Sequence, residues 1–130
     1  MTEKAVLNCF AGKKICIVGD IIADIFIFGR PYRLSREAPV VVIEQEEEKI
    51  FPGSAGNTIH NLLALGAEVY PIGLVGNDGP GATLMDYFMR FPLMRPDGII
   101  RYDGETITKT RIMAGDTHTS KQQVIRIDRD

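Results

Sequence analysis

The chain has 130 residues and a formal net charge of −2, with 45% apolar and 25% charged residues. This composition is typical of a globular domain with one core, and the small net charge excludes the basic field of a nucleic-acid-binding protein. No apolar run reaches the roughly 20 residues that span a bilayer, and residues 1–12 lack the apolar core of a signal peptide. Cys9 and Cys16 show no metal-ligand spacing, so we expect reduced packing residues and no metal site. We therefore expect a cytoplasmic protein that binds neither nucleic acid nor membrane.

Apolar residues recur along the chain with two different periods. In chain order they predict strands at 15–18, 25–28 and 40–44, a helix at 55–65, a strand at 69–75, a helix at 82–89, and strands at 108–113 and 124–127. The segments at 15–18, 55–65, 69–75 and 82–89 predict a doubly wound α/β fold whose parallel strands are covered on both faces. The remaining strands mix charged with apolar residues, which predicts a second sheet with one apolar and one polar face.

A glycine-rich turn leads into the first predicted helix, in the stretch Phe51-Pro-Gly-Ser-Ala-Gly-Asn-Thr-Ile-His60. The unpaired N–H groups of a helix amino terminus can meet ligand oxygens, and Gly53 and Gly56 let a ligand approach the backbone without meeting a Cβ. The side-chain amide of Asn57 can donate to and accept from vicinal hydroxyls, although it can also serve only to start the helix. This stretch predicts a sugar-binding loop, with Gly66 as the stop signal of its helix.

Two acids follow the first predicted strand, Lys14-Ile-Cys-Ile-Val-Gly-Asp20, since Asp24 comes four residues after Asp20. Ligands of open α/β sheets gather at the carboxyl ends of strands, which favours a role for these acids in ligand binding. Each has a structural alternative, because Asp24 can initiate a turn and Asp20 can cap the loop backbone.

These motifs resemble the ribokinase-like (PfkB) carbohydrate kinases, whose signature is a Gly-Gly-small-small-Asn loop and helix followed by two glycines separated by nine residues, as Gly66 and Gly76 are here. The segment Arg33-Leu-Ser-Arg-Glu-Ala-Pro-Val-Val-Val42 is similar to one in bacterial heptose 7-phosphate kinases, and segments 106–111 and 122–128 match that subfamily in order. Ser54 replaces the second signature glycine, where it can narrow the pocket or lend a hydroxyl. Ile59 and Arg36 also depart from the family pattern.

The resemblance implies the amino-terminal part of one ribokinase-like domain, with an α/β core at about 13–20 and 51–104 and a β-sheet lid at about 21–50 and 105–130. It implies transfer of the ATP γ-phosphate to O1 of a heptose 7-phosphate in the synthesis of ADP-heptose for lipopolysaccharide, with ATP and Mg²⁺ as cofactors. It also implies a homodimer that forms through the lid. The substrate-binding residues that it implies, together with those from the loop, are Asp20, Asp24, Arg33, Gly53, Ser54, Asn57, Lys109, Arg111 and Gln123.

Lys109 and Arg111 alternate onto one face of a predicted strand, where they can read a phosphate group on the sugar. The alternative is an ordinary solvated strand face, and Arg33 shares that ambiguity. The acidic run at 44–48 is interpreted as a solvated strand end, and neither His60 nor His118 has ligand partners at metal spacing.

The catalytic Gly-Ala-Gly-Asp motif of the family is absent from the sequence. Ala114-Gly-Asp116 is a partial match, but no helical period follows it, so we interpret it as a hairpin turn. The loop Gly76-Asn-Asp-Gly-Pro-Gly81 lacks the spacing of a nucleotide-binding motif, and its residues are typical of a turn. The 130-residue chain alone is therefore expected to be inactive. A sugar-binding or regulatory module without catalysis, a kinase for another sugar, and a different α/β enzyme remain as alternatives.

Overall fold

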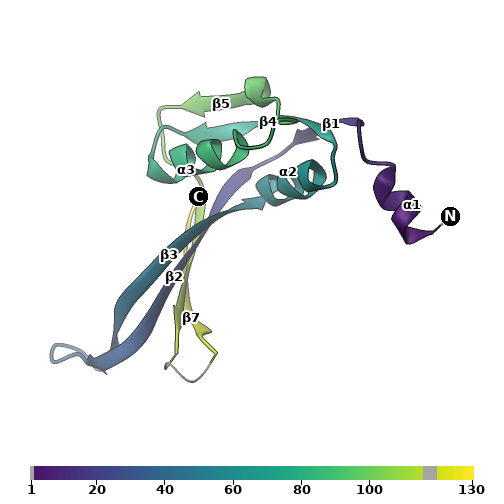
Figure 1. Cartoon of the computed structure of the whole chain (residues 1–130). Helices are drawn as coiled ribbons and strands as arrows, with labels where there is room; N and C mark the ends of the chain where they lie inside the picture. Colours follow the sequence, from purple (N-terminus) through teal and green to yellow (C-terminus); the bar gives the residue numbers. More distant parts are fainter. Residues whose placement is uncertain (1, 116–119) are drawn as a thin grey trace.

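The computed structural model describes residues 2–115 and 120–130. Figure 1 shows two β-sheets that meet at an angle, with helices on the smaller one. The elements in chain order are α1 (Glu3–Asn8), β1 (Lys14–Val18), β2 (Ile21–Leu34), β3 (Val41–Ser54), α2 (Ala55–Ala64), β4 (Glu68–Gly76), α3 (Gly79–Phe88), the 3₁₀ turn η1 (Pro96–Gly98), β5 (Ile99–Tyr102), β6 (Thr108–Ala114) and β7 (Gln122–Arg129).

The smaller sheet, which we call the core sheet, has three parallel strands in the order β1-β4-β5. Helices α2 and α3 lie on one face of it (Figure 1) and bury Ile59, Leu84 and Phe88 against Val69 and Val75. The predicted α/β fold class is confirmed in this part of the chain. Gly66 lies just after α2 and has a φ of +84°, which confirms the prediction that it ends this helix.

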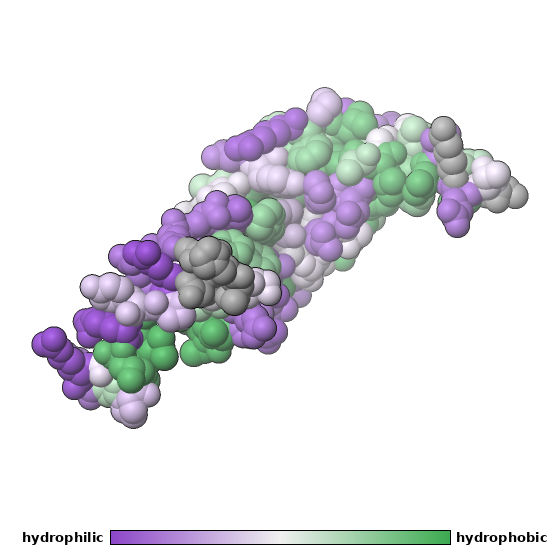
Figure 2. Space-filling model, turned by 60° about the horizontal axis from the view of Figure 1, so that its bottom comes forward, coloured by the Kyte–Doolittle hydropathy of each residue, from purple (hydrophilic) through white to green (hydrophobic). Residues whose placement is uncertain are grey.

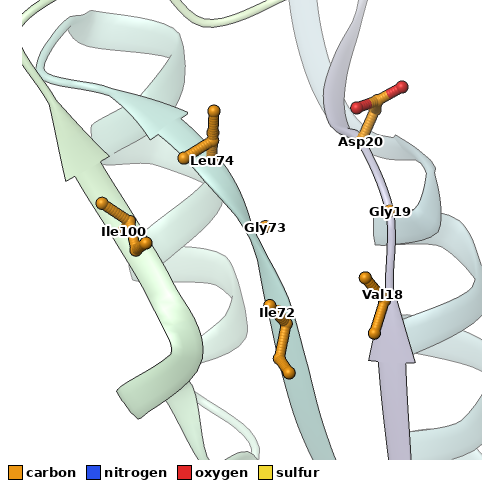
Figure 3. A pocket seen from close by; sticks show the side chains of 7 residues that line it. All are labelled: Val18, Gly19, Asp20, Ile72, Gly73, Leu74 and Ile100. Atoms are coloured by element: carbon orange, nitrogen blue, oxygen red, sulfur yellow. The ribbon is translucent and has the colours of Figure 1, made fainter.

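The second face of the core sheet is open, contrary to the prediction that helices cover both faces. Val18 is 74% exposed, Leu74 57% and Ile100 59%. Figure 3 shows these side chains on the face of the strands turned away from the helices. The reason is topological: the strand order β1-β4-β5 runs in one direction, and right-handed crossovers then place both helices on the same face.

The larger sheet, which we call the outer sheet, has four strands in the order β3-β2-β6-β7, with β2 and β6 parallel and the other pairs antiparallel. Strands β2 and β3 have 14 residues each and pair along nearly their whole length, so both are much longer than the segments predicted at 25–28 and 40–44. The outer sheet forms the elongated lobe of the molecule (Figures 1 and 2).

The two faces of the outer sheet differ as the alternating pattern predicted. One face carries Asp24, Lys109 and Arg111, while Ile25, Ile27 and Ile112 present apolar side chains to the other face. On that apolar face, Ile125 and Ile127 of β7 are 53% and 55% exposed. Hydrophobic residues are accordingly visible on the surface of the elongated lobe in Figure 2.

The acidic run at 44–48 lies in β3, and all five of its residues are exposed. Arg30 pairs with Glu44 at 2.7 Å, and Lys49 pairs with Glu47 at 3.0 Å. The predicted solvation of the run agrees with these positions, but the run lies inside β3 and not at a strand end as predicted.

Candidate functional site

The core sheet and the outer sheet meet where three chain segments cross between them. Strand β2 leaves the core at the buried residues Ile21 and Ala23, and β3 returns to it at Gly53. The Ala55 N–H of α2 donates to the Asp20 carbonyl at 3.0 Å, which holds the start of α2 against the end of β1. The third crossing is the segment between β5 and β6. Most of the predicted site residues lie around this junction.

The parallel pairing of β2 with β6 brings Asp24, Lys109 and Arg111 together. Asp24 and Lys109 are direct partners in the register. The Arg111 guanidinium donates to Asp24 Oδ1 at 2.7 Å and to the Lys109 carbonyl at 3.3 Å, and it lies 5.1 Å from the ring centre of Phe26. Both charged side chains of the pair are three-quarters buried or more, with 21% and 24% exposure. Because a charge-assisted bond is short and directional, this contact fixes the orientation of the Asp24 carboxylate.

Gly53 lies on β3 directly beside this carboxylate. A Cβ at position 53 would stand 2.8 Å from Asp24 Cγ and overlap one carboxylate oxygen, so no other residue fits without moving Asp24. Gly56 is buried against Pro52 and Phe88. The protein's own side chains thus approach both glycines closely, and the ligand contacts predicted for Gly53 and Gly56 stay a prediction.

Ser54 is the N-cap residue of α2 and has φ +51° and ψ −124°, which makes it the one non-glycine residue with positive φ among those that the structure describes. Its side chain is exposed and makes no capping hydrogen bond. Asn57, in the first turn of α2, is exposed as well, and its Oδ1 accepts from Asn61 Nδ2 at 3.3 Å. The polar groups of this turn therefore face solvent, close in sequence to Gly53.

Asp20 lies between β1 and β2 and lines a shallow depression with Val18, Leu74 and Ile100 (Figure 3). Asp20 follows the carboxyl end of β1, the usual place for ligands in open α/β sheets, while the depression extends over the middle of β4 and the start of β5. Its other lining residues are apolar or glycine, so Asp20 supplies the only charge there.

Two predicted residues do not join the cluster around Asp24. Arg33 lies nine positions farther along β2, which at the rise of an extended strand is roughly 30 Å away. Gln123 pairs with Met113, four positions along β6 from Lys109, and is exposed. The role of Arg33 and Gln123 in substrate binding stays a prediction, and within one chain neither residue lies near Asp24. Asp116, interpreted above as a turn residue, lies outside the described residues.

The sequence interpretation missed Phe26 and Phe51, which flank the charged cluster. Their rings are 5.8 Å apart in an edge-to-face arrangement, and Phe51 pairs with Asp24 across β2 and β3. Phe26 was detectable in principle, because it follows Asp24 with a period of two and so shares its face.

Binding of Mg²⁺ and of the phosphates of ATP requires a cluster of oxygen ligands and open backbone N–H groups. Within residues 2–115 and 120–130, no three acidic, histidine or cysteine side chains gather as a cation site. The glycine-rich loop at 76–81 is not an open phosphate cradle either, because a Cβ at Gly76 would stand 2.5 Å from Thr106 N and the Gly81 N–H is taken by Asp78. The described residues therefore do not fit these groups. In the same described part, no helix is long and apolar enough to cross a membrane.

Comparison with solved structures defines the fold class as ribokinase-like. The backbone matches a ribokinase from Arabidopsis thaliana, described as complexed with ribose and ATP, with a TM-score of 0.65 at 17% identity over 91% of this chain and 36% of that chain. The fold class expected from the motifs is thus confirmed.

Curated sequences then give the particular relatives. The chain is 39% identical over 123 residues to the bifunctional protein HldE of Gluconobacter oxydans, and 40% identical over 115 residues to that of Azorhizobium caulinodans. It is a homologue of these proteins with the fold of the ribokinase-like sugar kinases, as its motifs suggested. The alignments cover 94% and 88% of this chain but only 25% and 23% of the relatives, so the chain spans about a quarter of their length. No protein-family model matches it.

Proposed function

We propose that this chain is the sugar-binding part of an ATP-dependent carbohydrate kinase that phosphorylates O1 of a heptose 7-phosphate, in the synthesis of ADP-heptose for lipopolysaccharide. The observation that carries the proposal is the Asp24 carboxylate, which is held by Arg111 at 2.7 Å beside Gly53 at the entrance to α2. A carboxylate fixed in this way accepts hydrogen bonds from sugar hydroxyls without having to reorient. The relatives named HldE support the choice of a heptose.

The two cations beside Asp24 take different roles in this proposal. The charge of Arg111 is partly balanced by Asp24, and its position on the Phe26 ring restrains it further. Lys109 forms no ion pair with any described residue, although its neighbours in register are Asp24 and Asp128. We therefore assign the phosphate already on the sugar chiefly to Lys109, and the orientation of Asp24 chiefly to Arg111. Asp128 is itself paired with Arg126 at 2.9 Å, so Lys109 and Arg111 with the single carboxylate of Asp24 leave a net positive charge, which suits a phosphate group.

Titration calorimetry on the 130-residue chain, with heptose 7-phosphate and with the unphosphorylated heptose, tests this assignment. Lys109→Gln should weaken binding of the phosphosugar by roughly tenfold or more and leave the unphosphorylated sugar nearly unaffected, since a bond to a charged group contributes about 1.5–3 kcal/mol. Asp24→Asn should weaken both ligands. Lys14→Gln, at the opposite end of the core sheet, is the charge-matched control and should change neither.

Equal losses of affinity for both sugars in Lys109→Gln would mean that Lys109 is an ordinary exposed strand residue and does not bind the phosphate. Unchanged binding of both sugars in Asp24→Asn would show that the sugar site does not lie at this junction.

The remaining assignments rest on the resemblance to the ribokinase-like carbohydrate kinases. The kinase uses ATP and Mg²⁺, which on this proposal are bound mostly by residues outside this chain, and it acts in the cytoplasm. The outer sheet is the lid over the sugar, and its apolar face joins a second copy in a homodimer. The division at about 13–20 and 51–104 for the core, and 21–50 and 105–130 for the lid, is part of this proposal.

A second candidate is a sugar-binding or regulatory module that lacks catalysis, and a third is a kinase of the same fold for another sugar. The absence of Gly-Ala-Gly-Asp from the sequence favours the module for this polypeptide taken alone. We accordingly propose that the 130-residue chain transfers no phosphate by itself. Sugar-dependent ATP turnover by the purified chain would overturn that part of the proposal.

A further inference from the structure

The third crossing between the sheets is held by a cluster of polar groups around the buried Thr106, which precedes β6. The Thr106 hydroxyl donates to Asp78 Oδ1 at 2.6 Å and accepts from the Gly76 N–H at 3.1 Å, and the Thr106 N–H donates to Asp78 Oδ2 at 2.9 Å. Thr106 is 1% exposed. Three hydrogen bonds thus connect the β4–α3 loop of the core to the residue that leads into the outer sheet.

The glycines of this loop make room for the cluster. A Cβ at Gly81 would stand 2.6 Å from the Thr106 hydroxyl and 2.9 Å from Asp78 Oδ1, and a Cβ at Gly76 would stand 2.5 Å from Thr106 N. The composition of the stretch Gly76-Asn-Asp-Gly-Pro-Gly81 is typical of a simple turn. In the structure, its conformation instead accommodates Thr106, which lies 28 positions after Asp78 in the chain.

Beyond Thr106, the chain passes directly into the candidate site. The Ile107 carbonyl accepts from the Ala23 N–H at 2.9 Å, and this bond begins the pairing of β6 with β2. Thr108 is the buried first residue of β6, and Lys109 and Arg111 follow it. The placement of both cations against Asp24 therefore depends on where Thr106 is held.

We propose that Asp78 and Thr106 form a clamp that fixes β6 on the core and so positions Lys109 and Arg111 beside Asp24. The clamp itself is a property of the described residues, whereas its role in ligand binding rests on the proposed function. Asp78 and Thr106 are positioning residues, since neither lies in the charged cluster that would contact the sugar.

The ionisation of Asp78 supports this arrangement. Burial by itself raises the pKa of the Asp78 carboxyl, but the hydrogen bonds from Thr106 and Gly81 outweigh it and hold the pKa below its usual value. The carboxylate is therefore charged near neutral pH, and its bonds to Thr106 are charge-assisted.

Asp78 also has a simpler role, as the N-cap of α3 through the bond from the Gly81 N–H to Oδ1 at 2.9 Å. The two roles can be separated by substitution. Thr106→Val leaves the cap in place but removes the hydroxyl, which breaks the bonds to Asp78 Oδ1 and from Gly76. Thr106→Ser keeps the hydroxyl and is the matched control. Asp78→Asn keeps one side-chain oxygen as the acceptor of the cap bond. Its NH₂ group would face the Thr106 N–H, and the bond between them is lost because both groups are donors.

Hydrogen exchange on the 130-residue chain without ligand tests the clamp directly. In Thr106→Val and Asp78→Asn, the Ala23 amide and the amides of β6 should exchange roughly tenfold faster or more, because local opening of the β2–β6 pairing becomes easier. The amides of the β1–β4 ladder should change little, and Thr106→Ser should resemble the unsubstituted chain. An equal acceleration in both sheets, or none at Ala23, would overturn the clamp.

A second measurement tests the consequence for binding. Thr106→Val should weaken heptose 7-phosphate several-fold at a temperature where the chain stays folded. Val69→Ala, which opens a cavity in the core sheet away from the clamp, should lower stability without this loss of affinity. Equal losses of affinity in the two variants would mean that Thr106 acts only through global stability. If the unsubstituted chain does not bind the phosphosugar, the proposed function fails, while the exchange result still decides the clamp.

Discussion

The helix-covered face of the core sheet and the apolar face of the outer sheet use apolar residues in opposite ways. On the helix side of the core sheet, Ile59, Val69 and Phe88 are fully buried. On the apolar face of the outer sheet, Ile125 and Ile127 remain more than half exposed, although their strand pairs with β6 along nearly its whole length. Regular hydrogen bonding alone therefore does not tell which part of the molecule supplies its stability. The core sheet with its helices forms the stable part, while the outer sheet presents an apolar surface suited to a partner.

The largest effect should come from a direct test of this difference. Phe88→Ala removes a ring that is 0% exposed, and it should lower the free energy of unfolding by about 3–5 kcal/mol through lost burial and a residual cavity. Ile127→Ala, on the open face of β7, should cost at most about 1 kcal/mol. Urea titrations of both variants measure the two values. Similar losses would show that the outer sheet is already packed against something in solution.

The apolar face itself offers a second test. If it joins a second copy, Ile125→Asp should raise the dissociation constant of self-association by at least about tenfold, because a charge would enter an apolar contact. Arg126→Gln changes the next residue, whose side chain points to the opposite face, and should leave association unchanged. Sedimentation over a range of concentrations measures both. A chain that stays monomeric throughout, or an Ile125→Asp variant that associates equally well, would contradict the pairing.

The sequence predicted the elements whose signals are local. Helix α2 was recognisable from Ile59, Leu62 and Leu63 on one face and from Gly66 at its end, and both properties depend only on neighbouring residues. The length of β2 and β3 was not recognisable, because the acidic run at 44–48 and Pro31 are poor strand signals that cross-strand pairing overrides. The short strand β5 was missed as well, since four residues carry too little pattern.

The candidate site was predictable only in part, for a related reason. Asp24 and Arg111 were each singled out, but their contact joins residues 87 positions apart. It arises from the parallel pairing of β2 with β6, which no local period encodes. The same holds for Asp78 and Thr106, whose separate sequence contexts gave no hint of a shared cluster. Ser54 was noticed as a departure from a glycine, while the reason why a glycine suits that position is visible only in the backbone.

Substitution of Ser54, at the junction of the two sheets, should have the smallest effect on the free energy of unfolding. With φ +51° and ψ −124°, its backbone occupies a region that glycine enters freely and that costs other residues about 1–3 kcal/mol. Ser54→Gly should therefore raise the free energy of unfolding by roughly 1 kcal/mol, because the relief of strain exceeds the added entropy of the unfolded chain. The melting temperature should rise by about 3–5 °C for a domain of this size.

Two control variants at and beside the same turn separate strain from other causes. Ser54→Ala retains a Cβ and should stay near the stability of the unsubstituted chain, because the hydroxyl makes no capping bond. Ala55→Gly changes the first residue of α2, whose φ is not positive, and should lower stability by up to about 1 kcal/mol. If Ser54→Gly proved no more stable than Ser54→Ala, the backbone at the junction would be relaxed in solution, and the serine would carry no conformational cost. A gain confined to Ser54→Gly would instead place strain at the turn that joins the outer sheet to α2, beside the Asp24 carboxylate.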